Sequence, residues 1–365
     1  MTSTVAIKSI DFTPVDEISS YFRGRAAKVD RSEIGLYEGL KFLFGSAPNI
    51  TKQLSNIGDA EKSRLLTKEV SDAIASVAYE DMASAFAAWC HRMVLEYVYQ
   101  SDNSNEKLRN LLINLKECQI FGSTAMGPGT ANFLAGSEIP VKAKEGPGGL
   151  TANGKIRWAS NLTGNFVIVT AVQGNVSGHP YIVTIPGDSK SVSINKFSRL
   201  LGLDQTFSTS IDISDLNISE EDVVTKKFSD FMRSIIVPFL ILQSSFCKGL
   251  AARSLYESST LLNGPKQVFY EELEGHINTF NQLAAELLIK MDGDLATDEE
   301  INKLLQVRLN FALLASASVN LEYKLCGGSA YSISSPVSRR LREAAFLPIQ
   351  APTEVQLRWI LSQSN

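Results

Sequence analysis

The spacing of apolar residues changes twice along this chain of 365 residues. Between about residues 55 and 115, apolar residues recur every three to five positions, which is the spacing of one face of an α-helix. They include Ala73, Val77, Met82, Phe86, Trp89, Met93 and Tyr97. This periodicity predicts a helical N-terminal region.

The middle of the chain, from Gln119 to about Val224, has a different pattern. Short runs rich in β-branched residues, such as 165–172 and 181–185, alternate with dipeptides that favour turns. The turn dipeptides are Gly148-Gly149, Asn153-Gly154 and Pro186-Gly187. Several short strands at such intervals predict a compact β-barrel or sandwich.

From Lys226 onward the helical periodicity returns, in long amphipathic runs that are interrupted at Gly264-Pro265 and around residues 292–294. The last long run carries the stripe Ile301, Leu304, Leu305, Leu309, Leu313 and Val319. We therefore predict an α+β multidomain protein with three parts. They are a helical N-terminal domain over residues 1–117, a β-domain over 118–225 and a C-terminal helical bundle over 226–365.

Composition narrows the classes of function. Charged residues make up 20% of the chain and the net charge is −4, so we expect no general attraction to nucleic acid or anionic lipid. The longest apolar run, residues 235–242, is far shorter than the ~20 residues of a membrane span. The chain shows no secretory signal, and its four cysteines lack a Cys-x-x-Cys spacing, which favours reduced thiols in a cytoplasmic protein. The three histidines form no metal-binding pattern, so we predict no metal site.

The most specific pattern lies near the C-terminus. Residues 325–331 read Leu-Cys-Gly-Gly-Ser-Ala-Tyr, Arg342-Glu343-Ala344 follows, and residues 350–353 read Gln-Ala-Pro-Thr. This order resembles the cofactor-binding end of the acyl-CoA dehydrogenases, in which Gly-Gly-x-Gly-Tyr precedes Arg-Asp-Ala and Tyr-Glu-Gly-Thr. The resemblance implies an acyl-CoA dehydrogenase-like fold, with a four-helix bundle at the C-terminus. It also implies flavin contacts from Gly327, Gly328 and Thr353.

A second motif, residues 153–161, resembles the Leu-x-Gly-x-Lys-x-Trp-Ile-Thr-Asn segment of the same family. Gly154, Trp158 and Asn161 match, and Ser160 stands in the place of the Thr. A Trp can pack against the edge of a flavin ring, and a hydroxyl two residues later can donate to flavin N5 and so tune the reactive atom. The resemblance implies that Trp158 and Ser160 contact the cofactor. The alternative is that Trp158 belongs to the core of a strand and Ser160 is an edge hydroxyl.

A third motif, residues 121–130, resembles the family's Leu-Thr-Glu-Pro-Gly-Ala-Gly-Ser-Asp segment. Thr124 takes the place of the Thr, Met126 that of the Pro and Thr130 that of the Ser. Glycine-rich backbone with hydroxyls can hold an anion through its N–H groups. The resemblance implies that these three residues contact the flavin and its phosphates, although a plain loop between strands explains the same residues.

Two departures from the family concern its cofactor clamp and its catalytic base. The Arg that reaches the pyrophosphate of a neighbouring subunit's flavin is absent from residues 263–269, where Lys266 is the only cation. A Lys cannot reproduce a bidentate guanidinium contact. The usual catalytic Glu falls on Ala351, and the position used by a subset of the family falls on Phe239. Neither side chain can accept a proton.

His91 and Glu354 are the candidate catalytic residues that remain. Glu354 lies three residues beyond Ala351 and would reach the site only if the loop changes register. His91 lies on a helix that packs over the flavin in this family, and a His is suited to proton transfer at neutral pH. Its alternative role is that of a half-buried histidine bonded to a backbone carbonyl.

Three functions follow from these patterns. The first is an FAD-dependent oxidoreductase of the acyl-CoA dehydrogenase superfamily, acting on an acyl thioester or related small substrate with a non-standard or missing base. The second is a two-component flavin-dependent monooxygenase that takes reduced flavin from a partner reductase. The third is a non-catalytic homologue. The resemblance also implies a homodimer or homotetramer formed through the C-terminal helices, and an electron-transfer or reductase partner.

Overall fold

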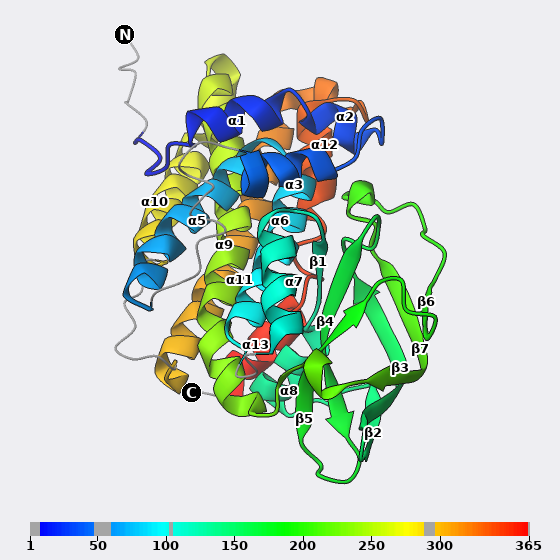
Figure 1. Ribbon diagram of the computed structural model, residues 1–365. Helices are drawn as coiled ribbons and strands as arrows, with labels where there is room; N and C mark the ends of the chain where they lie inside the picture. The colour runs from blue at the N-terminus through cyan, green and yellow to red at the C-terminus, as the bar shows by residue number, and fades with distance from the viewer. Residues whose placement is uncertain (1–7, 47–59, 102–104, 288–295, 364–365) are drawn as a thin grey trace.

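The computed structural model describes residues 8–46, 60–101, 105–287 and 296–363. Figure 1 shows a tall helical body with a sheet domain on one side of it. The order of helices, then strands, then helices confirms the predicted fold class. The predicted interruption around residues 292–294 lies outside the described residues, and the three domain boundaries stay a prediction.

The N-terminal helices surround one buried helix, α6. Asp81 begins α6, because its carboxylate accepts a hydrogen bond from the backbone N–H of Ser84 at 3.1 Å. All but the last residue of α6 are buried, so this helix runs through the interior. The elements are α1 (Asp16–Arg23), α2 (Ala26–Asp30), α3 (Tyr37–Lys41), η1 (Phe42–Ser46), α5 (Ala60–Glu80), α6 (Met82–Tyr99) and α7 (Glu106–Lys116).

The first helix, α1, is joined to the rest of the helical body by Glu80. This buried carboxylate, the last residue of α5, accepts hydrogen bonds from Ser19 and Arg23 on α1 and from Arg253 on a later helix. A carboxylate taken out of water is stable only when its oxygens are paired in this way. Glu80 therefore joins three helices that are far apart in the sequence.

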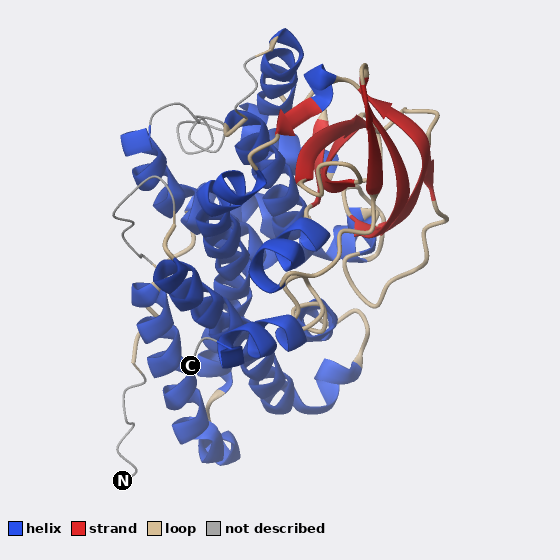
Figure 2. Cartoon of the chain, turned by 90° about the horizontal axis from the view of Figure 1, so that it is seen from below, coloured by secondary structure: helices blue, strands red, loops and turns tan. Residues whose placement is uncertain are grey.

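The strands of the middle region form one mixed sheet of eight strands, which curls strongly in Figure 2. The strands are β1 (Phe121–Ala125), β2 (Lys142–Gly146), β3 (Gly149–Ala159), β4 (Phe166–Gly174), β5 (Pro180–Pro186), β6 (Val192–Ile194), β7 (Thr209–Ile218) and β8 (Val223–Thr225). Their order is β6-β7-β3-β2-β4-β5-β8, and β1 pairs with β4 in parallel. Three short helices connect them: α8 (Gly127–Ala135), η2 (Asp204–Thr206) and η3 (Glu220–Asp222).

The C-terminal region is built on two long apolar helices. Its elements are α9 (Phe228–Leu261), η4 (Gly264–Phe269), α10 (Tyr270–Glu286), α11 (Asp298–Cys326), η5 (Gly327–Tyr331), α12 (Pro336–Ala344) and α13 (Glu354–Gln363). The helices that begin at Phe228 and Asp298 are long and apolar enough to cross a membrane. However, 94% and 67% of their most apolar windows are buried inside the protein. Such burial is expected of core helices.

The contact between α5 and α9 depends on a glycine. A Cβ atom added to Gly249 would come within 2.0 Å of the carbonyl oxygen of Ala75 and 2.8 Å of the Ala78 side chain. Only a residue without a side chain lets the two backbones approach this closely. The close contact fixes α9 in the centre of the molecule.

We predict that Gly249→Ala lowers the free energy of unfolding by roughly 1–3 kcal/mol, because the new methyl group forces two helices apart. Urea unfolding followed by circular dichroism measures the effect. The matched control is Gly275→Ala on α10, where an added Cβ meets no atom within 4 Å. That change should raise stability by up to about 1 kcal/mol through helix propensity. Equal effects of the two substitutions would contradict the proposed role of Gly249.

Candidate functional site

At the start of α8, the middle region of the chain contacts the C-terminal segment. We call the space between α8 and the loop of residues 350–353 the crevice. A Cβ atom added to Gly127, the first residue of α8, would lie 3.5 Å from the Cβ of Ala351. Below this contact, α8 and α13 enclose a small cavity, and Figure 1 shows the two helices side by side. The cavity is lined by Gly127, Thr130, Ala131, Leu134, Ala135, Pro352, Gln356 and Ile360. The structure therefore brings the third sequence motif and the end of the C-terminal motif together.

Thr130 and Gln356 are the residues with polar side chains that line this cavity, and Thr130 is the more deeply buried of the two. Its side chain is 1% exposed, and its hydroxyl has no hydrogen-bond partner among the described residues. A buried hydroxyl without a partner costs roughly 1–3 kcal/mol, so such a group in a native protein needs an explanation. The hydroxyl lies in the first half of α8, a helix of nine residues whose N-terminal N–H groups favour a negative charge. Apart from Thr130 and Gln356, the residues that line the cavity are glycine, proline and aliphatic residues.

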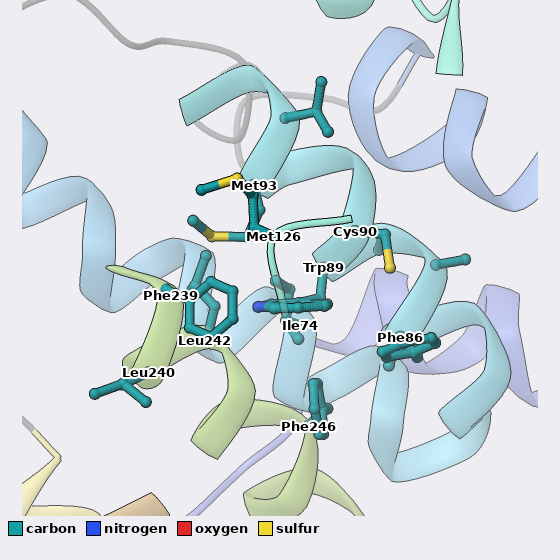
Figure 3. Packing of buried hydrophobic residues seen from close by; sticks show 14 of the residues in the cluster. Ile74, Phe86, Trp89, Cys90, Met93, Met126, Phe239, Leu240, Leu242 and Phe246 are labelled. Carbon is teal, nitrogen blue, oxygen red and sulfur yellow. The ribbon is translucent and has the colours of Figure 1, made fainter. Parts of the chain in front are cut away.

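Thr124 and Met126 are the other residues predicted from this motif, and both come just before α8 in the chain. The hydroxyl of Thr124 lies 3.2 Å from the hydroxyl of Tyr97 on α6. Met126 is fully buried, and Figure 3 shows its side chain in the helical interior near Met93. Thr124 thus remains partly accessible from the sheet domain, whereas Met126 forms part of the wall behind it.

Trp158 is 65% exposed, so it is not a core residue of its strand. The pairing of β3 with β7 changes register between Ile156 and Ala159, which is a β-bulge. A bulge breaks the alternation of faces, and both Arg157 and Trp158 consequently point to solvent. Asn161, just beyond β3, donates to the carbonyl oxygens of Gly122 (3.1 Å) and Ala87 (3.0 Å) and so ties this end of β3 to β1 and α6.

The hydroxyl of Ser160 takes part in a short chain of hydroxyls. It lies 2.7 Å from the hydroxyl of Ser208, which lies 2.7 Å from that of Thr206. Thr206 donates to the carbonyl oxygen of Leu203 at 2.7 Å. Since each hydroxyl has one proton, Ser208 then donates to Thr206 and Ser160 to Ser208. Donation from Ser160 to a cofactor would require this chain to reverse.

The loop of residues 350–353 is held by a buried polar network. Arg308 on α11 is fully buried and donates to the side-chain oxygens of Gln243 (3.1 Å) and Gln350 (2.6 Å). The amide groups of both glutamines donate in turn to the carbonyl oxygen of Ala351, at 2.9 and 3.2 Å. The hydroxyl of Thr353 accepts a hydrogen bond from the backbone N–H of Gln356 and so begins α13. The loop therefore has a fixed position between the bundle and α8.

Comparisons with known proteins identify this architecture. No protein-family model matches the sequence, and no curated protein matches it. Solved structures do match. Butyryl-CoA dehydrogenase from Megasphaera elsdenii is 14% identical, with 97% of this chain and 99% of that chain covered and a TM-score of 0.74. Glutaryl-CoA dehydrogenase from Mycobacterium smegmatis is 13% identical, with 95% and 93% covered and a TM-score of 0.75. FMN-bound TdsC from Paenibacillus sp. A11-2 is 18% identical, with 95% and 96% covered and a TM-score of 0.71.

The chain has the acyl-CoA dehydrogenase fold. The agreement extends over nearly the whole length of each structure at low sequence identity, so it concerns the architecture. The resemblance that the sequence motifs indicated is thereby confirmed at the level of the fold. The activity has to be argued from the side chains of this chain.

His91 is fully buried in this acyl-CoA dehydrogenase fold, and both of its ring nitrogens are bonded to the backbone. Its Nδ1 accepts from the N–H of Gly122 at 2.9 Å, and its Nε2 lies 3.1 Å from the carbonyl oxygen of Leu115, to which it donates. Burial lowers the pKa of His91 to about 4, because the charged imidazolium is poorly solvated there. This geometry favours the structural alternative, in which the histidine joins α6 to α7 and β1.

Glu354 is the first residue of α13, and its carboxylate pairs with Arg358 one turn later at 2.8 Å. The cavity beside it is lined by Gln356 instead.

Gly327 and Gly328 are exposed in η5, which follows α11 and precedes α12. In Figure 1 α12 and α8 lie at opposite ends of the helical body. Within one chain the structure therefore does not bring the glycine pair to the α8 cavity.

Arg308 and Gln243 lie outside all of the sequence motifs. Both lie within helical stretches that otherwise consist of apolar residues, namely Leu304, Leu305 and Leu309 around the arginine and Phe239 to Leu242 before the glutamine. A charged residue inside an apolar stripe is the signal that could have revealed them, because such a residue needs buried partners. Their shared partner, the loop at Ala351, lies too far along the chain to be found from spacing.

We predict that stability falls as the pH drops from about 6.5 to about 4, in part because of His91. The pKa of His91 is lowered in the folded state, so the unfolded chain binds the extra proton first and gains in free energy over this window. A shift of this size corresponds to roughly 3 kcal/mol at the lower end. Urea unfolding at pH 7.5, 6 and 5 should show a flatter pH dependence for His91→Gln than for the wild type. His179→Gln, at an exposed histidine, is the control and should leave the slope unchanged.

Proposed function

We propose that this chain is a flavin-dependent oxidoreductase that acts on a small substrate, an acyl thioester or a related molecule, without the usual carboxylate base. The observation that supports the proposal most is the cavity at the start of α8, where the buried hydroxyl of Thr130 lacks a partner. A phosphate of the cofactor would accept from this hydroxyl and from the N–H groups of the first turn of α8.

Two further predicted site residues would contact the remaining parts of a flavin in this proposal. Trp158 offers an exposed ring at the end of β3, and Thr124 offers a partly accessible hydroxyl on β1. Pro352, Gln356 and Ile360 form the opposite wall, and Ala351 contacts Gly127 beside it. A flavin held there would supply the ability to accept or transfer electrons, and the protein would bind and orient it.

FAD is the cofactor that the sequence resemblance implies, and FMN is the alternative. Lys266 replaces the arginine clamp for the pyrophosphate, and a point charge holds such a group less firmly than a guanidinium. FMN has a single phosphate and no adenosine, so the loss of the clamp affects it less. FMN-bound TdsC, which shares the fold, is in line with this alternative.

A two-component monooxygenase is the second candidate, and the state of the base positions favours it. Ala351 and Phe239 cannot remove a proton, His91 is bonded to the backbone on both sides, and Glu354 pairs with Arg358. Removal of an α-proton from a thioester needs a base within hydrogen-bond reach. A reaction that uses reduced flavin from a partner reductase and molecular oxygen does not require a carboxylate in this loop. A non-catalytic homologue is the third candidate.

A homodimer or homotetramer is part of the proposal. Large apolar side chains near the C-terminus are more than half exposed, in two groups, one at or just after η5 and one on α13 or in the loop before it. Exposed apolar side chains of this kind can be covered by a neighbouring subunit. They are Tyr331, Ile333, Ile349, Val355 and Trp359. A neighbouring copy that covers them would also give the exposed pair Gly327 and Gly328 a partner surface.

We predict that Thr130→Val weakens flavin binding about tenfold, since it removes one hydrogen bond to a charged group. Wild-type protein titrated with FAD, with FMN and with reduced FMN, followed by absorbance and flavin fluorescence, gives the reference affinities. Thr184→Val is the matched control, because this buried hydroxyl donates to the carbonyl oxygen of Asp222, away from α8.

Each result of the titration separates the candidates. Tight binding of oxidised FAD supports the oxidoreductase that acts on a thioester, whereas binding of reduced FMN alone supports the monooxygenase. If the wild type binds no flavin in any state, both enzyme functions are wrong and the non-catalytic homologue remains. Equal flavin affinities of the Thr130 variant and the wild type would remove Thr130 from the proposed site.

A further inference from the structure

Aromatic rings from three segments fill the space between α6, α9 and the chain that follows α12. Trp89 stacks on Phe86, with ring centroids 5.6 Å apart, and meets the rings of Phe239 at 5.2 Å and Phe246 at 6.2 Å edge-on. Phe346 packs against Phe86 at 4.7 Å. These five residues are called the aromatic cluster below, and Figure 3 shows four of them.

The aromatic cluster lies next to residues that adjoin the crevice, on the side of the helical body. Gln243, which donates to the carbonyl oxygen of Ala351, is about one helical turn from both Phe239 and Phe246 on α9. Met126, at the start of α8, lies beside the cluster in Figure 3. A substrate group that entered the helical body past Met126 or Ala351 would meet these rings first.

The cluster is packed as core. The side chains of Phe86, Trp89, Phe239 and Phe246 are at most 6% exposed. The indole N–H of Trp89 has no partner among the described residues, although a smaller apolar residue would avoid this unpaired donor. Trp89 therefore contributes through its size and shape, because its ring contacts three others at once.

We propose that the aromatic cluster limits the substrate to a short molecule that stays in the crevice between α8 and the loop of residues 350–353. A long acyl chain cannot enter the helical body, because the rings occupy that space. Trp89 is the main specificity-determining residue, since it contacts both the α6 and the α9 parts of the cluster. The inference rests on the proposed function, for which it names the substrate class.

The test compares acetyl-CoA, butyryl-CoA and octanoyl-CoA in binding to the wild type and to Trp89→Gly, measured by calorimetry. A chain that enters an apolar cavity gains roughly fourfold in affinity per buried methylene group. In the wild type we expect the three affinities to agree within about threefold, because the chain stays in water. In Trp89→Gly, octanoyl-CoA should bind at least about 50-fold more tightly than acetyl-CoA, which three buried methylene groups are enough to give.

Phe239→Ala opens the aromatic cluster from α9 and provides the same test if Trp89→Gly does not fold. The matched control is Phe280→Ala, a fully buried ring that packs on Phe311 at 6.1 Å in the α10–α11 contact. It should lose stability without any gain for long chains. Far-ultraviolet circular dichroism verifies that each variant is folded.

Two results overturn the inference: an affinity of the wild type that rises with chain length, or cluster variants that are folded and show no such rise. If the wild type binds no thioester, a gain in the cluster variants still supports the inference and its absence contradicts it. Flavin affinity is measured separately on the same proteins. A wild type that binds no flavin refutes the proposed function, while the chain-length series decides the role of the cluster by itself.

Discussion

The central position of α9 is the constraint on which the rest of the molecule depends. On one face, Gly249 lets the backbone of α9 approach α5 closely, and on another Gln243 joins the network of Arg308 and the loop at Ala351. The aromatic cluster lies on the same helix through Phe239 and Phe246. Because protein interiors are close-packed, a shift of α9 would move the loop, the cluster and the wall of the α8 cavity together.

The proposed site offers groups that could bind a cofactor but few groups that could take part in a reaction. The start of α8 offers N–H groups and the unpaired hydroxyl of Thr130, and the bulge in β3 exposes Trp158. Yet the two positions from which the fold usually supplies a base hold a methyl group and a phenyl ring. Under the proposed function, the cofactor and a second reactant would therefore supply and accept the protons, and the protein would bind and orient them.

The order of helical and β regions could be predicted from the sequence. Helices and strands place their apolar residues at different spacings, and these spacings can be recognised along the chain. The sequence motifs also contain Gly127, Thr130 and Pro352, which the structure brings together around the α8 cavity. From the sequence, bonding of His91 to a backbone carbonyl was included as an alternative, but the sequence could not predict the partners Leu115 and Gly122, which are reached only through the packing of α6 against α7 and β1. The exposure of Trp158 likewise depends on a bulge, which no spacing of residues reveals.

Arg308 has a consequence for the electrostatic potential of the crevice. It donates to two neutral amides, and among the described residues it forms no ion pair. A charge in a buried, weakly polarisable environment is screened much less than one in water, so its field extends further. Although the chain as a whole is acidic, with a net charge of −4, the wall that carries Ala351 therefore has a positive potential. This local potential is opposite in sign to the net charge of the chain.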